Sequence, residues 1–191
     1  MRAVEIGVGR EYGCPAMDRQ ELLLSITRVA RLTGDFRLRS GASSREYFDK
    51  YRFESEPKLL RAVAQQLAPL VPTDTEILAG LELGGVPIAT ALSLETGLPV
   101  AFVRKEAKLY GTCRLAEGVP IEGRRLLVVE DVVTSGGQVV TSTEQLRTLG
   151  ASISSVICVI DRQAGGVEAL SQIDLRLSAL FTKSELEAAI G

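Results

Sequence analysis

One segment of the chain combines three features in direct succession: Leu126-Leu127-Val128-Val129-Glu130-Asp131-Val132-Val133-Thr134-Ser135-Gly136-Gly137-Gln138. Its four leading apolar residues are typical of a strand buried on both faces of a parallel sheet. Two acids follow where we expect the strand to surface, and a run of small residues comes next. Helical spacing resumes through residues 139–149, with Gly150 placed to end the helix. This order predicts a ligand site, because open α/β sheets bind ligands at the carboxyl ends of their strands.

The small residues 134–137 have the chemistry of an anion site. Their hydroxyls and backbone N–H groups can surround a phosphate at the positive end of a helix. Glu130 and Asp131 would repel that phosphate, so we expect them to accept hydrogen bonds from vicinal hydroxyls or to hold a hydrated Mg²⁺. An ordinary turn with acids near a helix dipole is the alternative. Because Thr-Ser-Gly-Gly is in register with the acids, the pattern favours a ribose phosphate.

This segment resembles the phosphoribosyl pyrophosphate (PRPP) signature of the type I phosphoribosyltransferases. In that family the acids bind the ribose hydroxyls and the loop binds the 5′-phosphate. The resemblance implies an α/β fold with a twisted, mainly parallel sheet flanked by helices, a small N-terminal hood and a mobile catalytic loop. It implies that PRPP contacts Glu130, Asp131, Val133, Thr134, Ser135, Gly136, Gly137 and Gln138.

Composition is that of an ordinary globular protein. The 191 residues fit one domain with a sizeable core, with 46% hydrophobic and 24% charged residues. The net charge of −2 gives no sign of a nucleic-acid surface or a polybasic membrane patch. No apolar run approaches membrane-spanning length and no signal peptide is evident, so a cytoplasmic location is expected.

The absence of histidine narrows the chemistry further. It excludes Ser-His-Asp and Cys-His nucleophile systems and every His-ligated metal site. The three cysteines are far apart and odd in number, which supports neither a disulfide framework nor a CxxC metal site. We expect Cys158, inside an apolar run, to lie in the core. Catalysis must then use carboxylates, Lys, Arg and backbone dipoles.

The N-terminal third is expected to be less regular than the rest. Residues 1–16 should form a loosely packed extension, followed by a single domain at 17–191, with a helical and β-hairpin hood (17–70) and a PRPP-binding core (71–191). A capping box at Asp18-Arg19-Gln20-Glu21 predicts a helix that ends near Gly34. Alternation predicts strands at 36–39 and 46–53, with Tyr47, Asp49, Tyr51 and Phe53 on one side. Ser55-Glu56-Pro57 should begin a second helix.

From residue 76 the pattern alternates between strands and helices. Strands are expected at 77–79, 100–103, 126–129 and 153–160, and helices at 87–94 and 138–149. Gly84-Gly85 lies at a second strand end, with Pro87 suited to a first helical turn. Glycines before a helix are a weak signal alone, but two such strand ends in one parallel sheet point to one crevice. In the resembled family this loop meets the pyrophosphate.

Residues 104–123 are predicted to form a polar loop, and its cations cluster at the start, as Arg104, Lys105 and Lys108. A loop longer than about a dozen residues in a compact domain is usually functional or disordered. A solvated charged loop is the alternative. Because the loop should leave the same sheet edge as the phosphate site, and PRPP is highly anionic, the sequence favours a lid.

Four motifs in order narrow the resemblance to the orotate phosphoribosyltransferases, over about residues 20–182. They are the hood segment Phe36–Gly41 with Tyr47-Phe48-Asp49, the loop Leu83–Pro87, the loop Arg104-Lys105-Glu106 with Lys108, and Asp161-Arg162-Gln163. The resemblance implies catalytic roles for Arg104, Lys105, Lys108 and Asp131, and pyrophosphate contacts at Gly84 and Gly85. It implies orotate contacts at Arg162, Thr134, Tyr47 and Phe48. Packing is the alternative for the aromatic residues, and a salt bridge to Asp161 or Asp174 for Arg162.

The implied reaction is displacement of pyrophosphate from PRPP by orotate, giving orotidine 5′-monophosphate in pyrimidine biosynthesis. The implied cofactor is Mg²⁺, held mainly by PRPP and water near Glu130 and Asp131 rather than by dedicated protein ligands. The implied assembly is a homodimer in which loop 104–118 is shared across the interface. Two alternatives stay open: an enzyme for another base, such as a purine, and a non-catalytic PRPP-sensing regulator.

The chain departs from the family pattern at three places. Ala42-Ser43 stands where many members have a hood lysine, Gly84 where some have a lysine in the pyrophosphate loop, and Tyr110 where the catalytic loop usually has histidine. Each departure removes a cation or a donor near PRPP or the base. We therefore expect an effect on affinity and rate rather than on the type of reaction.

Overall fold

The structure is a computed structural model that describes residues 17–37, 41, 43–106 and 114–189. The predicted extension at 1–16 lies outside the described residues, as do Ala42, Lys108 and Tyr110. In the described part of the chain, no helix is long and apolar enough to cross a membrane.

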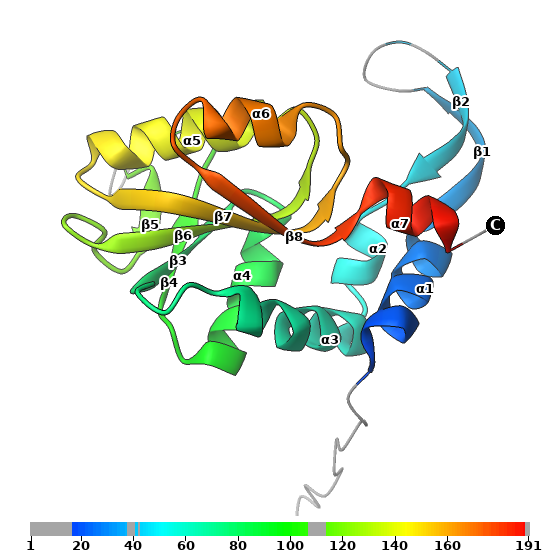
Figure 1. Ribbon diagram of the computed structural model, residues 1–191, viewed down its shortest axis with the longest axis horizontal. Helices are drawn as coiled ribbons and strands as arrows, with labels where there is room; N and C mark the ends of the chain where they lie inside the picture. Colours follow the sequence, from blue (N-terminus) through cyan, green and yellow to red (C-terminus); the bar gives the residue numbers. More distant parts are fainter. Residues whose placement is uncertain (1–16, 38–40, 42, 107–113, 190–191) are drawn as a thin grey trace, which may run out of the picture.

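A six-stranded sheet forms the centre of the molecule (Figure 1). Its strand order is β5-β4-β3-β6-β7-β8, and every neighbouring pair is parallel except β4 and β5. This confirms the predicted mainly parallel sheet. The strands are β3 (Ile77–Leu81), β4 (Val100–Val103), β5 (Ala116–Gly118), β6 (Arg125–Val133), β7 (Ser152–Asp161) and β8 (Arg176–Thr182).

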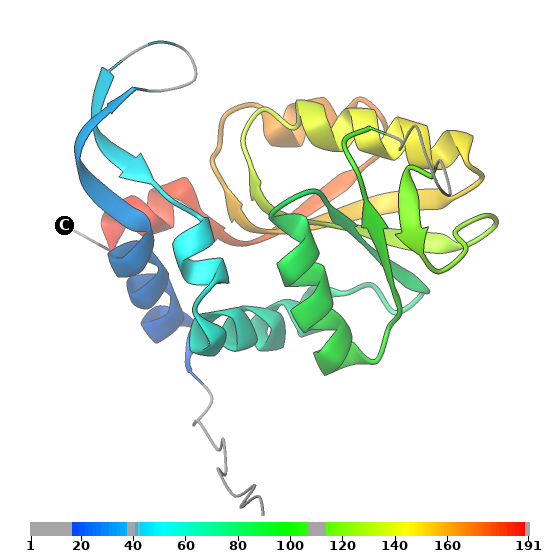
Figure 2. The same cartoon turned by 180° about the vertical axis from the view of Figure 1, so that it is seen from behind.

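Helices cover both faces of this sheet. One face carries α3 (Pro57–Leu67) and α4 (Gly85–Thr96), and the other carries α5 (Gly137–Thr148) and α6 (Gly166–Ser171) (Figures 1 and 2). Helix α1 (Arg19–Ala30) packs against α3, to one side of the sheet. Alternate residues of β6 enter the two resulting cores, with Leu127 and Val129 in one and Leu126 and Val128 in the other. The prediction of a strand buried on both faces is confirmed, and Cys158 is fully buried as expected.

An antiparallel hairpin of β1 (Arg31–Arg37) and β2 (Ser43–Phe48) extends away from the sheet (Figures 1 and 2). Both strands are mostly exposed. The chain returns to the core through α2 (Tyr51–Glu54) and α3, and the short helix η1 (Ala68–Leu70) follows. At the C-terminal end, α7 (Lys183–Ala188) packs beside α1.

The predicted boundaries of this N-terminal part are partly wrong. The capping box at Asp18 is confirmed, but α1 ends at Ala30 rather than near Gly34, because Arg31 turns to an extended conformation and pairs with Phe48. Strand alternation was predicted to continue to Phe53, whereas β2 ends at Phe48. The short helix α2 then turns Phe53 into the core, where it is fully buried.

Two predictions about the core also need correction. The acidic pair lies inside β6 rather than beyond its end, because β7 is long enough to keep pairing with β6, from Glu130 opposite Cys158 to Val133 opposite Asp161. The stretch predicted as one long loop is shorter, because β5 pairs with β4. Leu115 and Ile121, on either side of β5, pack into the core.

Candidate active site

Two helix N-termini meet at one edge of the sheet. Helix α4 follows β3 and α5 follows β6, and these two strands are parallel neighbours. The N-cap residues are Gly84 and Gly136, and neither helix has a side-chain cap. The first backbone N–H groups of a helix lack partners within the helix, so each end can receive an anion. The structure therefore brings together the two loops that the sequence predicted to share a crevice.

The loop before α5 has the form of a phosphate site. Thr134, Ser135 and Gly137 are exposed, whereas Val133 and Gly136 are buried. Gly136 has φ +77°, a left-handed conformation that favours glycine. Two hydroxyl-bearing residues are therefore exposed beside the positive end of a helix. The amide of Gln138 points instead along the helix, where its Nε2 donates to Ser142 Oγ at 3.0 Å.

The loop before α4 is shaped by contact with β6. A Cβ atom on Gly84 would lie 1.6 Å from Oδ2 of Asp131, and one on Gly85 would lie 2.3 Å from the carbonyl oxygen of Val129. Non-bonded atoms cannot approach so closely, so a side chain at residue 84 or 85 would clash with β6. In the sequence, Gly84 stands where some members of the resembled family have a lysine. The structure shows that the acid from the neighbouring strand occupies that space.

A lysine from the N-terminal part reaches the same acid. Lys50, the N-cap residue of α2, places its Nζ 2.5 Å from Oδ2 of Asp131. The Asp131 side chain is fully buried, whereas that of Lys50 is 31% exposed. Sequence reasoning missed Lys50, because nothing in the local pattern links a cation after β2 to an acid in β6.

Burial and mutual repulsion shift the pKa values of the neighbouring acids. Burial, with the hydrogen bond and charge of Asp131, raises the pKa of Glu54 to about 9. Burial and then Asp131 likewise raise the pKa of Glu130 well above its ordinary value. Burial would lower the pKa of Lys50, but Asp131 outweighs this and the net shift is upward. Glu54, Glu130 and Asp131 together have three carboxyl groups, and Lys50 can neutralise only one of them. This imbalance favours protonation of an acid or binding of a further cation.

The acidic pair offers one unpaired acceptor to a hydrated metal ion. No group of three or more His, Cys, Asp or Glu residues in the described ranges is placed to hold a metal. Oε2 of Glu130 is buried without a hydrogen-bond partner, beside Asp131. Such an oxygen can accept from the water of a hydrated Mg²⁺ that a ligand brings with it.

Three of the residues predicted to contact the base meet at one cavity of about 580 Å³: Tyr47, Phe48 and Arg162. The guanidinium carbon of Arg162 lies 5.9 Å from the centre of the Phe48 ring, within cation–π range. Arg31 and Lys183 also line the cavity. Thr134, the fourth predicted residue, is not among the lining residues. It lies on the loop before α5, whose Val133 carbonyl oxygen accepts from the backbone N–H of Arg162 at 2.8 Å.

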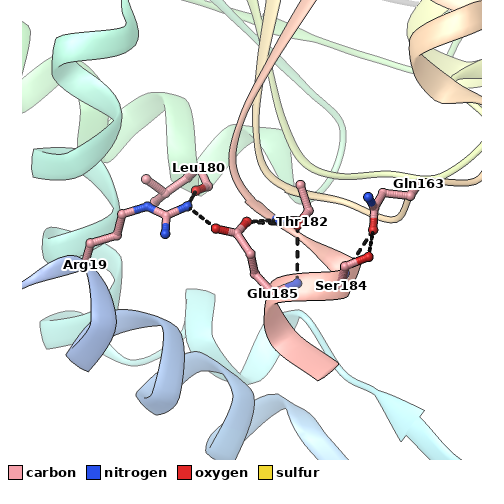
Figure 3. Close-up of polar contacts among 6 residues, drawn as sticks. All are labelled: Arg19, Gln163, Leu180, Thr182, Ser184 and Glu185. Atoms are coloured by element: carbon pink, nitrogen blue, oxygen red, sulfur yellow. Dashed lines mark hydrogen bonds and ion pairs between the residues drawn. The ribbon is translucent and has the colours of Figure 1, made fainter. Parts of the chain in front are cut away.

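Arg162 makes neither of the alternative salt bridges within the described residues. Oδ1 of Asp161 instead accepts from the backbone N–H of Gln163 at 2.8 Å. Oε1 of Gln163 accepts from Ser184, from its N–H at 2.9 Å and its hydroxyl at 2.6 Å (Figure 3). These bonds fix the turn on both sides of Arg162 and leave its guanidinium facing the cavity.

A second set of contacts in Figure 3 ties α1 to the same region. Arg19 on α1 donates at 2.7 Å to the carbonyl oxygen of Leu180 and to Glu185. Glu185 in turn forms a capping box with Thr182 at the start of α7. The helix that leads into the hairpin is thereby attached to the end of β8 and to α7, whose Ser184 is bonded to the turn that contains Arg162.

The base of the predicted lid lies beside the α4 loop. The backbone N–H of Lys105 donates to Oε2 of Glu82 at 3.1 Å, and that of Arg104 donates to the Leu115 carbonyl oxygen at 2.9 Å. Nε of Arg104 is buried without a hydrogen-bond partner. The structure places Arg104 and Lys105 near the loop before α4, and Lys108 lies outside the described residues.

Comparison with known proteins identifies relatives over most of the chain. Residues 52–174 match the family model described as "Phosphoribosyl transferase domain". An orotate phosphoribosyltransferase of a Nocardioides species is 51% identical over 168 residues, covering 88% of this chain and 94% of the relative. The orotate phosphoribosyltransferase of Mycobacterium tuberculosis, in complex with Fe(III) dicitrate, superposes with a TM-score of 0.80 at 32% identity, covering 88% of this chain and 98% of that one. Its complex with PRPP superposes with a TM-score of 0.76 at 28% identity and the same coverage.

Proposed function

The chain belongs to the orotate phosphoribosyltransferases, and from this premise we propose which of its residues carry each part of the reaction. The enzyme transfers the phosphoribosyl group of PRPP to orotate in pyrimidine biosynthesis, forming orotidine 5′-monophosphate and pyrophosphate. This assignment excludes the purine enzyme and the non-catalytic sensor that the sequence left open.

One observation carries the assignment of the PRPP site: two helix N-termini without side-chain caps flank a pair of buried acids. In our proposal the 5′-phosphate binds at the start of α5, through residues 133–138, and the diphosphate binds at Gly84 and Gly85. Glu130 and Asp131 accept hydrogen bonds from the ribose hydroxyls between them. This arrangement puts the anionic ends of PRPP at positive helix ends and its hydroxyls at carboxylates.

The cavity beside Arg162 is the proposed orotate site. Its guanidinium pairs with the orotate carboxylate, and the rings of Phe48 and Tyr47 cover the base. Thr134, on the loop between the cavity and α5, is proposed to complete the contacts. Deprotonated orotate needs no strong protein base, which agrees with a chain that has no histidine.

Catalysis is proposed to rest on positioning and on charge stabilisation of the leaving group. Arg104 and Lys105 neutralise charge as it builds on the departing pyrophosphate, together with Lys108. Asp131 holds the ribose as the anomeric carbon becomes cationic. When bound with PRPP, Mg²⁺ supplies further neutralisation of the diphosphate, with Glu130 and Asp131 as the nearest acids. Closure of the lid excludes water and limits hydrolysis of PRPP.

The proposed orotate site is tested by Arg162→Ala, with Arg176→Ala as the matched control on the exposed surface of β8. Activity is followed as the loss of orotate absorbance with PRPP and Mg²⁺. The orotate KM of Arg162→Ala should rise by at least about tenfold, because a charge-assisted pair is lost, while the PRPP KM stays within about twofold. An equal rise in both KM values, or equal use of uracil and orotate by the wild type, would contradict the assignment.

We also propose a homodimer in which loop 104–118 of one subunit serves the site of its neighbour. A twofold interface satisfies this with one patch used twice. The test mixes two inactive variants, Lys105→Ala and Asp131→Asn. If the sites are shared, one site of each mixed dimer receives both wild-type parts and a fraction of activity returns. A monomer in solution, or no recovery after demonstrated subunit exchange, would show that each chain closes its own lid.

A further inference from the structure

Lys50 occupies an unusual place for a surface cation. Its Nζ contacts a fully buried acid, yet its side chain keeps 31% of its surface exposed. The ammonium therefore lies between the buried Asp131 carboxylate and solvent. Within the described residues its polar contacts are the ion pair with Asp131 and a cation–π contact with the Tyr51 ring at 5.3 Å. An ammonium has three N–H donors, so others are left for a ligand.

The ammonium also lies at the start of α4. Oδ2 of Asp131 is 2.5 Å from Nζ of Lys50, and it is 1.6 Å from the point where a Cβ of Gly84 would stand. Because the two distances share one atom, Nζ is within about 4.1 Å of that point. A cation beside a helix N-terminus is unfavourable unless an anion balances both positive charges. In this structure the Asp131 carboxylate balances these charges. A diphosphate carries more negative charge than a carboxylate and can balance them more fully.

We propose that Lys50 binds the diphosphate of PRPP, so that the segment after β2 supplies a cation to the α4 loop, where Gly84 leaves no room for a side chain. This inference rests on the proposed placement of PRPP between α4 and α5. Lys50 lies outside the sheet and reaches this position by contacting Asp131. The carboxylate of Asp131 is the group that occupies the space beside Gly84. Binding of the diphosphate therefore links the N-terminal part of the chain directly to the core.

The experiment separates the two ends of PRPP by using two probes, inorganic pyrophosphate with Mg²⁺ and ribose 5-phosphate. Their affinities are measured by calorimetry for the wild type, Lys50→Met, Lys50→Gln and the control Lys58→Met, an exposed lysine on α3. Both Lys50 variants should bind pyrophosphate about tenfold more weakly, since a charge-assisted contact is lost. Ribose 5-phosphate affinity should change by less than about threefold, and its retention shows that the variant protein is folded. Lys58→Met should match the wild type.

A second pair of variants separates direct contact from support of Asp131. If Lys50 touches the diphosphate, Lys50→Met must weaken pyrophosphate binding in an Asp131→Asn background as well. Loss of the effect in that background would show that Lys50 only neutralises the acid, and would overturn the inference. Unchanged pyrophosphate affinity in both Lys50 variants, or a loss confined to ribose 5-phosphate, would overturn it too. A wild type in which PRPP fails to compete with pyrophosphate would instead refute the placement of PRPP itself.

Discussion

The two helix N-termini of the proposed active site both have glycine as the N-cap residue, but for different physical reasons. At α5, Gly136 is required by its own backbone, which has φ +77°. At α4, Gly84 has an ordinary φ of −69°, and it is required because Asp131 from another strand fills the space beside it. The first requirement is local in the sequence, whereas the second arises from a contact across 47 positions of the chain.

This difference separates two kinds of binding loop. The α5 loop presents exposed hydroxyls and can be recognised from residues 133–138 alone. The α4 loop has one acid, Glu82, and it gains Asp131 and Lys50 as neighbours only when β6 and α2 pack against it. The effects of mutation should differ accordingly.

The largest effect is expected for Gly84→Ala. The new Cβ would displace the Asp131 carboxylate, and with it the Lys50 ion pair. A misplacement of about 1 Å at a catalytic group can reduce activity by about a hundredfold, so kcat/KM for PRPP should fall by at least that factor. Steady-state kinetics measure the loss. Activity within about threefold of the wild type would show that Asp131 can move without harm, and the contrast between the loops would fail.

A smaller effect is expected for Gly136→Ala. The left-handed backbone at Gly136 penalises any side chain, so the free energy of unfolding should fall by about 1 kcal/mol and PRPP affinity by about tenfold. Gly97→Ala is the matched control, because Gly97 has φ +75° at the far end of α4 with open space around it. It should lose similar stability in denaturant unfolding and keep its kinetics. Equal kinetic losses in both variants would mean that the effect at Gly136 is one of general stability.

The smallest effect on activity is expected for Glu54→Gln, which tests whether the acid beside Asp131 is neutral. The pKa of Glu54 is raised from 4.5 to about 9, so at pH 7 the folded protein holds a proton that the unfolded chain has lost. Its contribution to stability is fully present below pH 4.5 and is lost as pH rises towards 9. Gln resembles the protonated acid and does not titrate. Activity at pH 7 should therefore stay within about threefold of the wild type, a change of less than ~1 kcal/mol.

The stability of the same variant shows in which direction the pKa of Glu54 is shifted. Thermal unfolding without substrates should show Glu54→Gln gaining on the wild type as pH rises from 5.5 to about 8.5, with the difference vanishing near pH 5. A difference that is constant with pH, or that grows towards acid pH, would mean that Glu54 is ionised in the folded protein and pairs with Lys50.

The sequence alone was sufficient wherever the relevant physics is local. The apolar run at 126–129 predicted a doubly buried strand, Asp18 predicted the start of α1, and Thr134-Ser135-Gly136-Gly137 predicted the loop that leads into α5. Motif order was enough to identify the family. Each of these signals depends on neighbours within a few residues, where side-chain period, capping and backbone conformation operate.

The remaining features were decided by tertiary contacts. Pairing with Phe48 ended α1 at Ala30, and pairing with a long β7 kept the acidic pair inside β6. Burial turned Phe53 inward and broke the predicted alternation after Phe48. The roles of Lys50 and Gly84 both depend on Asp131, which pairs with the first and fills the space beside the second. Ion pairing and steric exclusion act over a few ångströms in space, whatever the separation along the chain.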